Sequence, residues 1–426
     1  MTRVLLISLS LPPFRESQTI RSAYIVQVAS QYGVEFGLVS AEVPENLADA
    51  TLNELLPLGI PFWRTAPPIY TRIYARLNRL RWGKGIGYLY GNLAYRLLVP
   101  DVYAGWQKQA YTLAHKAIEE FRPDILMSAS GSCTAHIACA MLARTARIPW
   151  IADLGDPWSW VDWQHKDTWF KAVFNSRLER RVLQHASLLV LTTHQTANAY
   201  EKKGFHNTLV VPYGYRSVDF PTESVRTHTP PITLTYVGAA SRRARNLIPL
   251  ITSLDKKVAS ADYRLQIVGP ASKHFREAAI RSGLHNCLFT GAVSYRESIN
   301  YIRNASILIL VGNRSPYQVP GKTFLYLASG RPILYLAQMN EDEDPTYEIL
   351  RNFPGVRRVM NEMAEIRDLW GRLSWDNFVQ WERDAQKHLS MPELHQYQID
   401  KAVEPLVRSL PTLKEGNSCS LHSLAC

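Results

Sequence analysis

The chain has 426 residues, of which 46% are hydrophobic and 20% charged, so its composition is that of a globular protein and excludes a disordered or fibrous one. That length exceeds one ordinary core, and we expect two domains of about 100–200 residues each. The formal net charge of +11 indicates a negatively charged partner: nucleic acid, anionic lipid or a phosphorylated substrate.

The first half alternates short β-branched runs with helical patterns, as a parallel sheet with crossover helices requires. The N-terminal apolar run ends in Pro-Pro without a small-residue cleavage site, so we interpret it as the first strand. No run of about 18 apolar residues predicts a transmembrane span. Strands are expected over Val4–Leu9, Glu35–Val39, Asp124–Ser128, Pro149–Asp153, Ser187–Leu191 and Thr208–Val211, and helices over Thr19–Gln31, Ala104–Phe121, Thr134–Arg147 and Trp169–His185.

Residues 55–100 contain no Asp or Glu but interleave basic and aromatic side chains. Two interpretations stay open: contact with an anionic membrane, and a basic helix that packs on the first domain. The residues concerned are Arg64, Arg72, Arg76, Arg79, Arg81, Lys84 and Arg96, with Trp63, Tyr70, Tyr74, Trp82, Tyr88, Tyr90 and Tyr95.

After Val211 a stretch rich in Pro, Ser and Thr predicts an interdomain linker, and the alternation then restarts. Two successive αβ alternations predict two Rossmann-like doubly wound domains that face each other across a cleft. We expect domains over 1–215 and 216–380, a helix over 381–410 that crosses back to the first domain, and a flexible tail over 411–426. The second set of strands is Ile232–Val237, Arg264–Val268, Cys287–Thr290, Ser306–Leu310 and Pro332–Leu336, with helices over Asn246–Val258 and Thr323–Ala328.

The cysteines lack the paired spacing of a disulfide framework or a zinc site. We therefore expect free thiols, a reducing and hence cytoplasmic location, and no metal. These residues are Cys133, Cys139, Cys287, Cys419 and Cys426.

The segment YVGAASRRARNLIPLI places Gly238 directly after a predicted strand, ahead of Arg242, Arg243 and Arg245. Glycine permits close backbone approach, and guanidinium groups bind a diphosphate bidentately while they neutralise its charge. This pattern predicts a phosphate site, with Arg245 ahead of its neighbours. The alternative is a solvated basic loop.

The segment VPGKTFLYLASGRPIL places Gly321 and Lys322 at the start of a short helix. A helix N-terminus beside a lysine favours an anion. The later Ser-Gly-Arg-Pro run by itself predicts only a helix-to-strand turn. Lys322 is therefore the second predicted phosphate ligand.

Two carboxylates, Asp153 and Asp156, follow a first-domain strand in PWIADLGDPWSW. They could hold sugar hydroxyls or orient an acceptor, or they could form an Asp-Pro turn with a helix cap. The loop after the first strand offers Arg15, Glu16 and Ser17, but it lacks glycine, so no tight phosphate cradle is expected there.

Taken in order, ADLGDPW, LERRVL, ASLLVLTT, VVPYGY, TYVG with its arginines, RLQIVG, FTGAVSYRES and PGKTFLYLASGRPIL resemble family 4 glycosyltransferases over roughly residues 120–336. The resemblance implies a GT-B fold, a nucleotide-diphosphate sugar bound mainly by the second domain, hexosyl transfer with retention, and no metal or other cofactor. It assigns the diphosphate to Arg245 and Lys322 and places Asp156 near the acceptor.

The chain departs from the family pattern at three positions. Many members carry two glutamates with seven residues between them, the second of which holds the donor ribose. Tyr317 and Leu325 stand here instead, beside Gly321 in the donor pocket. Gly155 stands where relatives often have Arg or His.

Three functions follow as hypotheses. The first is a glycosyltransferase for a polysaccharide, glycolipid or glycosylated metabolite, which uses a nucleotide sugar and an unknown acceptor, in the cytoplasm or peripherally at a membrane. The second is a non-catalytic glycosyltransferase-like partner protein, which the substitutions at Tyr317 and Leu325 motivate. The third is nucleic-acid binding, which is disfavoured because no RNA- or DNA-binding module occurs.

Overall fold

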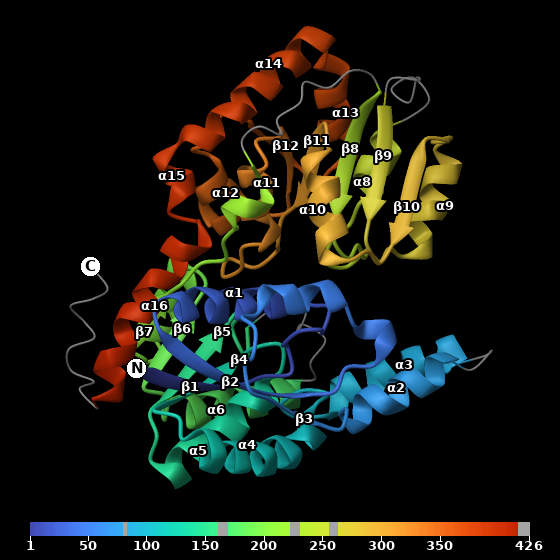
Figure 1. Ribbon diagram of the computed structural model, residues 1–426. Coiled ribbons are helices and arrows are strands. Elements are labelled where there is room, and N and C mark those ends of the chain that lie inside the picture. Colours follow the sequence, from blue (N-terminus) through green and yellow to red (C-terminus); the bar gives the residue numbers. More distant parts are fainter. Residues whose placement is uncertain (80–82, 161–168, 222–230, 255–262, 416–426) are drawn as a thin grey trace. The chain divides into compact units, whose positions relative to one another are not determined.

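The computed structural model describes residues 1–79, 83–160, 169–221, 231–254 and 263–415 (Figure 1). The chain divides into two compact units. The first comprises Met1–Pro212 together with the chain from Ala402 onward, and the second comprises Tyr213–Lys401. Each unit is an α/β domain with its own sheet and its own buried core.

Among the described residues, the first unit has a seven-stranded sheet in the order β3-β2-β1-β4-β5-β6-β7, and its neighbouring strands run parallel. The central strands are short apolar runs because both faces of a parallel sheet are covered by helices; all five residues of β4 are buried. The strands are β1 (Thr2–Ile7), β2 (Val34–Ala41), β3 (Phe62–Thr65), β4 (Ile125–Ala129), β5 (Trp150–Leu154), β6 (Leu188–Leu191) and β7 (Thr208–Val210).

Helices on both faces of this sheet complete the first core, with α1 on one face and α4 and α5 on the other (Figure 1). Alanines at helical spacing in α4, namely Ala110, Ala114 and Ala117, are fully buried and let this helix lie close to the strands. The helices are α1 (Ser17–Gln31), α2 (Ile69–Arg79), α3 (Gly83–Leu97), α4 (Gln107–Phe121), α5 (Cys133–Ala146), α6 (Trp169–Leu183), α7 (His194–Glu201) and α16 (Ile399–Lys414).

The second unit has a six-stranded sheet in the order β10-β9-β8-β11-β12-β13, again with parallel pairings. Its core includes Phe275 of α9, Trp370 of α13 and Trp381 of α14. The strands are β8 (Ile232–Val237), β9 (Tyr263–Val268), β10 (Cys287–Gly291), β11 (Ile307–Val311), β12 (Ile333–Ala337) and β13 (Val356–Met360), and the helices are α8 (Ile248–Ser253), α9 (Lys273–Arg281), α10 (Tyr295–Arg303), α11 (Lys322–Ala328), α12 (Pro345–Leu350), α13 (Met363–Arg372), α14 (Trp375–Gln386) and α15 (Pro392–His395).

Every strand expected from the sequence is present, with ends that differ by at most two residues. Two further strands, β3 and β13, were not expected. Both are edge strands and only partly buried, and their sequences, FWRT and VRRVM, contain arginine, so they lack the apolar run of a central strand. The helix expected over Asn246–Val258 is observed as α8, and its expected continuation from residue 255 lies outside the described residues.

The C-terminal region forms several helices where one crossing helix over 381–410 was expected. Trp381 of α14 is buried in the core of the second unit, and its indole N–H donates to the Gly355 carbonyl at 2.8 Å. In α16, residues from Ala402 onward belong to the first unit, where the Lys414 ammonium contacts Asp124 at 3.1 Å. This helix extends to Lys414, into the range expected to be a tail.

Candidate functional site

Glycines follow three strands of the second sheet at its carboxyl edge, where open parallel sheets bind ligands. Gly238 follows β8, Gly269 follows β9 and Gly312 follows β11. Gly238 and Gly269 have φ angles of +128° and +125°, and a Cβ atom on Gly269 would lie 2.5 Å from the Gly238 carbonyl oxygen. Only glycine fits this close approach of two loops.

Lys322 begins α11 and reaches back to this edge. Its ammonium donates to the carbonyl of Val237, the last residue of β8, and lies 4.2 Å from the ring centroid of Tyr236. Burial lowers the pKa of Lys322 well below its ordinary value, and the charge of Arg245 lowers this pKa further. A bound anion would stabilise the ammonium form and oppose both effects.

Arg245 is held at the same edge by backbone contacts. Its guanidinium donates to the carbonyls of Ala244 at 3.0 Å and Gly312 at 3.4 Å. A Cβ atom on Gly238 would lie 2.5 Å from the Lys322 ammonium, and the charge of Arg245 is close enough to lower the pKa of Lys322. The structure therefore brings together three predicted residues: Gly238, Arg245 and Lys322. Arg242 and Arg243 lie exposed in the same loop.

Sequence reasoning missed two residues at this edge, Gln338 and Arg314. The Gln338 amide donates to the Gly312 carbonyl and to the Ala244 carbonyl, the latter at 3.2 Å, and it accepts from Arg314 at 3.0 Å. The sequence marks these two residues only by their position after a strand. Gln338 directly follows β12, and Arg314 follows β11 by three residues. Gln338 ties the arginine loop to the sheet, and Arg314 adds another cation.

None of the three residues expected to line the donor pocket carries a charged side chain. Leu325 lies one turn after the start of α11 and is partly buried. A Cβ atom on Gly321 would lie 2.9 Å from the ring of Tyr213, so glycine is needed for this contact. Tyr317 is partly exposed, and its backbone N–H donates to the Ser315 hydroxyl at 3.4 Å.

In the first unit, Asp153 is the next-to-last residue of β5 and is completely buried. Its carboxylate accepts from Arg21 at 2.8 Å and 3.1 Å and from Gln18 at 3.0 Å. Arg21 also donates to the Val211 carbonyl at 2.8 Å. In this arrangement Asp153 ties α1 to β5 and to the chain after β7, whereas Asp156, three residues on, is partly exposed.

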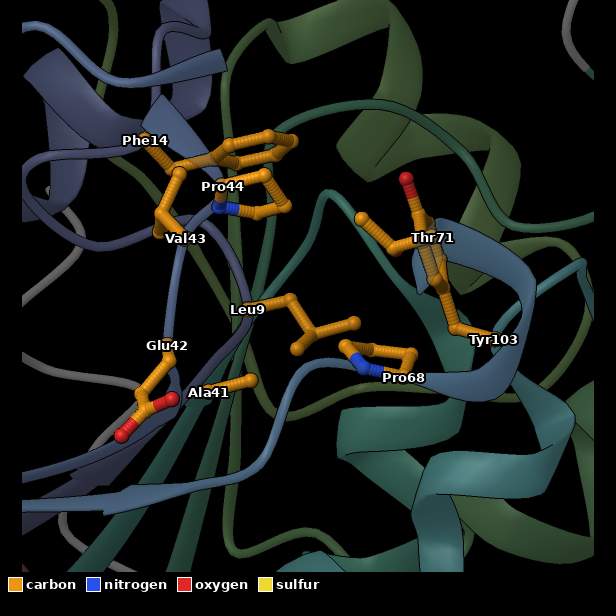
Figure 2. A pocket seen from close by; sticks show the side chains of 9 residues that line it. All are labelled: Leu9, Phe14, Ala41, Glu42, Val43, Pro44, Pro68, Thr71 and Tyr103. Atoms are coloured by element: carbon orange, nitrogen blue, oxygen red, sulfur yellow. The ribbon is translucent and has the colours of Figure 1, made fainter. Parts of the chain in front are cut away.

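A pocket opens at the carboxyl ends of β1 and β2 (Figure 2). Figure 2 shows Leu9 between a group formed by Phe14, Val43 and Pro44 and a second group formed by Pro68, Thr71 and Tyr103. The lining is mostly apolar, and Thr71 and Tyr103 add hydroxyl groups, whereas the Glu42 carboxylate points away from Leu9 (Figure 2). Such a lining suits an acceptor with both apolar and hydroxyl groups.

Glu16 lies close to this pocket, after β1, and accepts from the Ser10 hydroxyl at 2.7 Å. Gly131, after β4, has φ +109°, and a Cβ atom on it would lie 1.7 Å from that hydroxyl oxygen. β1 and β4 are neighbours at the point where the strand order reverses direction, which is the usual ligand position in such sheets. Burial raises the pKa of Glu16 to about 7, against a smaller opposing effect of the Ser10 hydrogen bond.

The raised pKa of Glu16 predicts a pH-dependent stability. The folded protein binds this proton more tightly than the unfolded chain, whose pKa is near 4.5, so the contribution is complete below pH 4.5 and is lost as pH rises through about 7. As pH rises from 4.5 to about 7, the unfolding free energy of the wild type should fall relative to that of Glu16→Gln. Urea denaturation of both proteins at several pH values measures the difference, and parallel pH profiles would contradict the prediction.

In the described part of the chain, no group of three or more His, Cys, Asp or Glu residues could hold a metal ion, and no helix is long and apolar enough to cross a membrane. Cys133, Cys139 and Cys287 are free thiols. Cys419 and Cys426 lie outside the described residues.

Two Rossmann-like domains with a glycine-rich, basic edge on the second sheet define the GT-B class of fold. Residues 56–214 match the profile of the glycosyl transferase 4-like domain, which confirms the resemblance for that part of the chain. No curated protein matches the chain in sequence.

Solved structures with similar folds include enzymes of two kinds. HepE of Anabaena, in complex with UDP and glucose, is 12% identical with a TM-score of 0.65 and covers 97% of this chain and 100% of its own. Sucrose-phosphate synthase from Thermosynechococcus elongatus is 11% identical with a TM-score of 0.64, over 98% and 100%. UDP-GlcNAc 2-epimerase from Neisseria meningitidis, bound to UDP-GlcNAc, is 13% identical with a TM-score of 0.58, over 97% and 100%.

Proposed function

We propose that this protein transfers a sugar from a nucleotide-diphosphate sugar to an acceptor. The observation that carries the proposal is the cluster of Gly238, Arg245 and Lys322 at the carboxyl edge of the second sheet. Two partly buried cations beside a glycine that a ligand can approach closely suit a diphosphate, whose leaving charge must be neutralised as the sugar departs. Because HepE and the Neisseria epimerase were crystallised with UDP or a UDP-sugar, UDP-sugars are the first donors to test.

Each donor-side residue has a proposed role. Lys322 and Arg245 bind the diphosphate, with Arg242 as an outer contact, and Gly238 lets the phosphates approach the backbone. Gly321, Tyr317 and Leu325 shape the pocket for the nucleoside. Because these cations supply the charge that a metal would otherwise supply, we propose that transfer is independent of metal and cofactor and proceeds with retention.

The acceptor side is proposed to lie in the first unit. Asp156 is partly exposed after β5, so it could bind an acceptor hydroxyl, and Glu16 with the pocket of Figure 2 offers a second carboxylate beside an apolar surface. Asp153, which is fully buried in its ion pair, is proposed to position this region rather than to touch substrate.

We place this activity in polysaccharide, glycolipid or glycosylated-metabolite biosynthesis, in the cytoplasm and peripherally at a membrane, without a nucleic-acid partner. The second candidate remains a non-catalytic glycosyltransferase-like partner protein. It is favoured by Tyr317 and Leu325, since neither side chain can accept the ribose hydrogen bonds of a glutamate.

A panel of nucleotide sugars tests the proposal. Each is incubated with the protein, with and without EDTA and with candidate acceptors, and the sugar products are followed by NMR. Glycoside product or slow donor hydrolysis supports a transferase, and EDTA should not alter it. Conversion of UDP-GlcNAc to its 2-epimer would instead identify an epimerase, and donor binding without any product would favour the non-catalytic partner.

Leu325→Glu is expected to strengthen donor binding. A carboxylate at this position of α11 would accept hydrogen bonds from ribose hydroxyls, each worth about 0.5–1.5 kcal/mol. The wild type should nevertheless retain activity, because such losses are small beside the ~8–23 kcal/mol by which enzymes lower barriers. Calorimetric titration with UDP compares Leu325→Glu with Leu325→Gln and the wild type. Activity gained only by Leu325→Glu would show that the natural leucine disables the site.

A further inference from the structure

Helix α3 turns an apolar stripe toward solvent. Its side chains Ile86, Leu89, Leu93 and Leu97 recur at helical spacing and are between 53% and 69% exposed. An amphipathic helix of a globular domain normally turns such a stripe inward. Scattered exposed apolar residues are common, but a continuous stripe on one helix marks an interaction surface.

The outward direction of the stripe is fixed by the opposite face of α3. Ala94 and Gly87 are buried there, and a Cβ atom on Gly91 would lie 3.4 Å from the ring of Tyr74 in α2. Tyr70 stacks on Tyr74 and Tyr90 with ring centroids 5.7 Å and 5.6 Å apart, which joins the two helices. Small residues and tyrosines therefore form the inner contact and leave the larger aliphatic side chains outside.

Helix α6 adds a second set of exposed apolar side chains. Trp169 is 81% exposed, and Phe170, Val173 and Phe174 are exposed on the same turns. The rings of Phe170 and Phe174 lie 5.1 Å apart.

Contacts from the other side of α6 hold it beside α3. The Lys171 ammonium donates to the Tyr95 carbonyl and lies 4.5 Å from that ring centroid, and the Asn175 amide donates to the Pro100 carbonyl at 3.2 Å. We call the exposed apolar side chains of the two helices the α3–α6 face: Ile86, Leu89, Leu93, Leu97, Trp169, Phe170, Val173 and Phe174.

Cations accompany this face, and the described residues of α2, α3 and α6 present no exposed carboxylate. Residues 55–100 contain no acid, and the one acid of α6, Glu179, is buried and accepts from the Tyr200 hydroxyl. Exposed arginines on α2, α3 and α6 are Arg72, Arg76, Arg96, Arg177, Arg180 and Arg181. Apolar and aromatic side chains beside arginines match a bilayer interface with anionic head groups.

We propose that the α3–α6 face docks this protein on an anionic lipid bilayer, with its apolar side chains in the interface and the neighbouring arginines on the head groups. A second copy of the chain fits less well, because self-association would bring the exposed arginines of α2, α3 and α6 in two copies together. The docking does not depend on sugar transfer, but it would bring a lipid-linked acceptor within reach of the first unit.

Vesicle flotation of the full chain tests the docking. At low salt the protein should float with phosphatidylglycerol vesicles and much less with phosphatidylcholine vesicles. Added salt should reduce binding without abolishing it, since the apolar contacts remain. Brominated lipid should quench tryptophan fluorescence, and Trp169→Phe should lose most of that quenching. Failure of the wild type to float with phosphatidylglycerol vesicles at low salt overturns the proposal.

Charge-introducing variants test which surface is responsible. Leu93→Glu with Phe170→Glu should abolish flotation, and Arg72→Ala or Arg96→Ala should weaken binding about fivefold each. Ile280→Glu changes a 77% exposed residue on α9 and should float as the wild type does. Binding of Leu93→Glu with Phe170→Glu at the wild-type level overturns the proposal, as does a dimer in sedimentation that only this variant loses. UDP titration of each variant separates loss of docking from loss of the donor site.

Discussion

Removal of the charge at Lys322 or Arg245 is expected to weaken binding of a UDP-sugar by about 10-fold to 150-fold each, because a lost hydrogen bond to a charged group costs about 1.5–3 kcal/mol. Both cations lie at the carboxyl edge of the second sheet, where Lys322 contacts the Val237 carbonyl. Isothermal titration of Lys322→Ala and Arg245→Ala with UDP and UDP-glucose measures the loss.

The controls separate charge from packing. Lys322→Met keeps an aliphatic stem over the Tyr236 ring but carries no charge, so it should bind as weakly as Lys322→Ala while it unfolds at nearly the wild-type temperature. Arg281→Ala removes an exposed arginine from α9 and should leave affinity unchanged. Wild-type affinity in both Lys322→Ala and Arg245→Ala would remove the diphosphate site from this edge.

A pH effect accompanies this binding. Burial and Arg245 lower the pKa of Lys322, and a bound diphosphate raises it, so binding takes up a proton whenever the free lysine is partly neutral. Titrations in buffers of different ionisation enthalpy would show this uptake, and Lys322→Met should lack it.

The sequence predicted the sheet cores because parallel strands buried on both faces are continuous apolar runs, such as ILILV in β11. It did not predict β3 and β13, since an edge strand is half exposed and tolerates the arginines of FWRT and VRRVM. The sequence offered a basic helix within residues 55–100 only as one of two interpretations, and helical periodicity normally assigns the leucines of α3 to the inside. Only the contacts of Gly91 and Ala94 show that they lie outside.

The sequence could predict the donor-side cluster because its residues come shortly after strands or at the start of a helix. Gly238, Arg245 and Lys322 each stand near the carboxyl end of a strand or the start of a helix, and parallel strands bring such positions to one edge. The partners of Asp153 were not predictable, because Arg21 is 132 residues away in sequence and no local pattern marks the pair. The same holds for Glu16 and Gly131, which meet only because β1 pairs with β4.

The ion pair of Asp153 and Arg21 should matter most for stability. Both side chains are almost fully buried, and their closest atoms are 2.8 Å apart. Asp153→Ala would leave the Arg21 guanidinium buried without its counter-ion, at a cost of about 3–5 kcal/mol of unfolding free energy. Urea denaturation of the variant and the wild type measures the difference.

A double variant decides whether the pair stabilises the fold or serves the chemistry. Arg21→Met with Asp153→Leu replaces both charges by apolar side chains of similar size, so no charge is left buried alone and much of the stability lost in Asp153→Ala should return. If Asp153 only positions the first unit, sugar transfer should return with it. Restored stability without any transfer would place Asp153 in the reaction itself. A double variant as unstable as Asp153→Ala would show instead that hydrogen bonds, rather than the charge pair, hold α1 on the sheet. These are the bonds from Arg21 to the Val211 carbonyl and from Gln18 to Asp153.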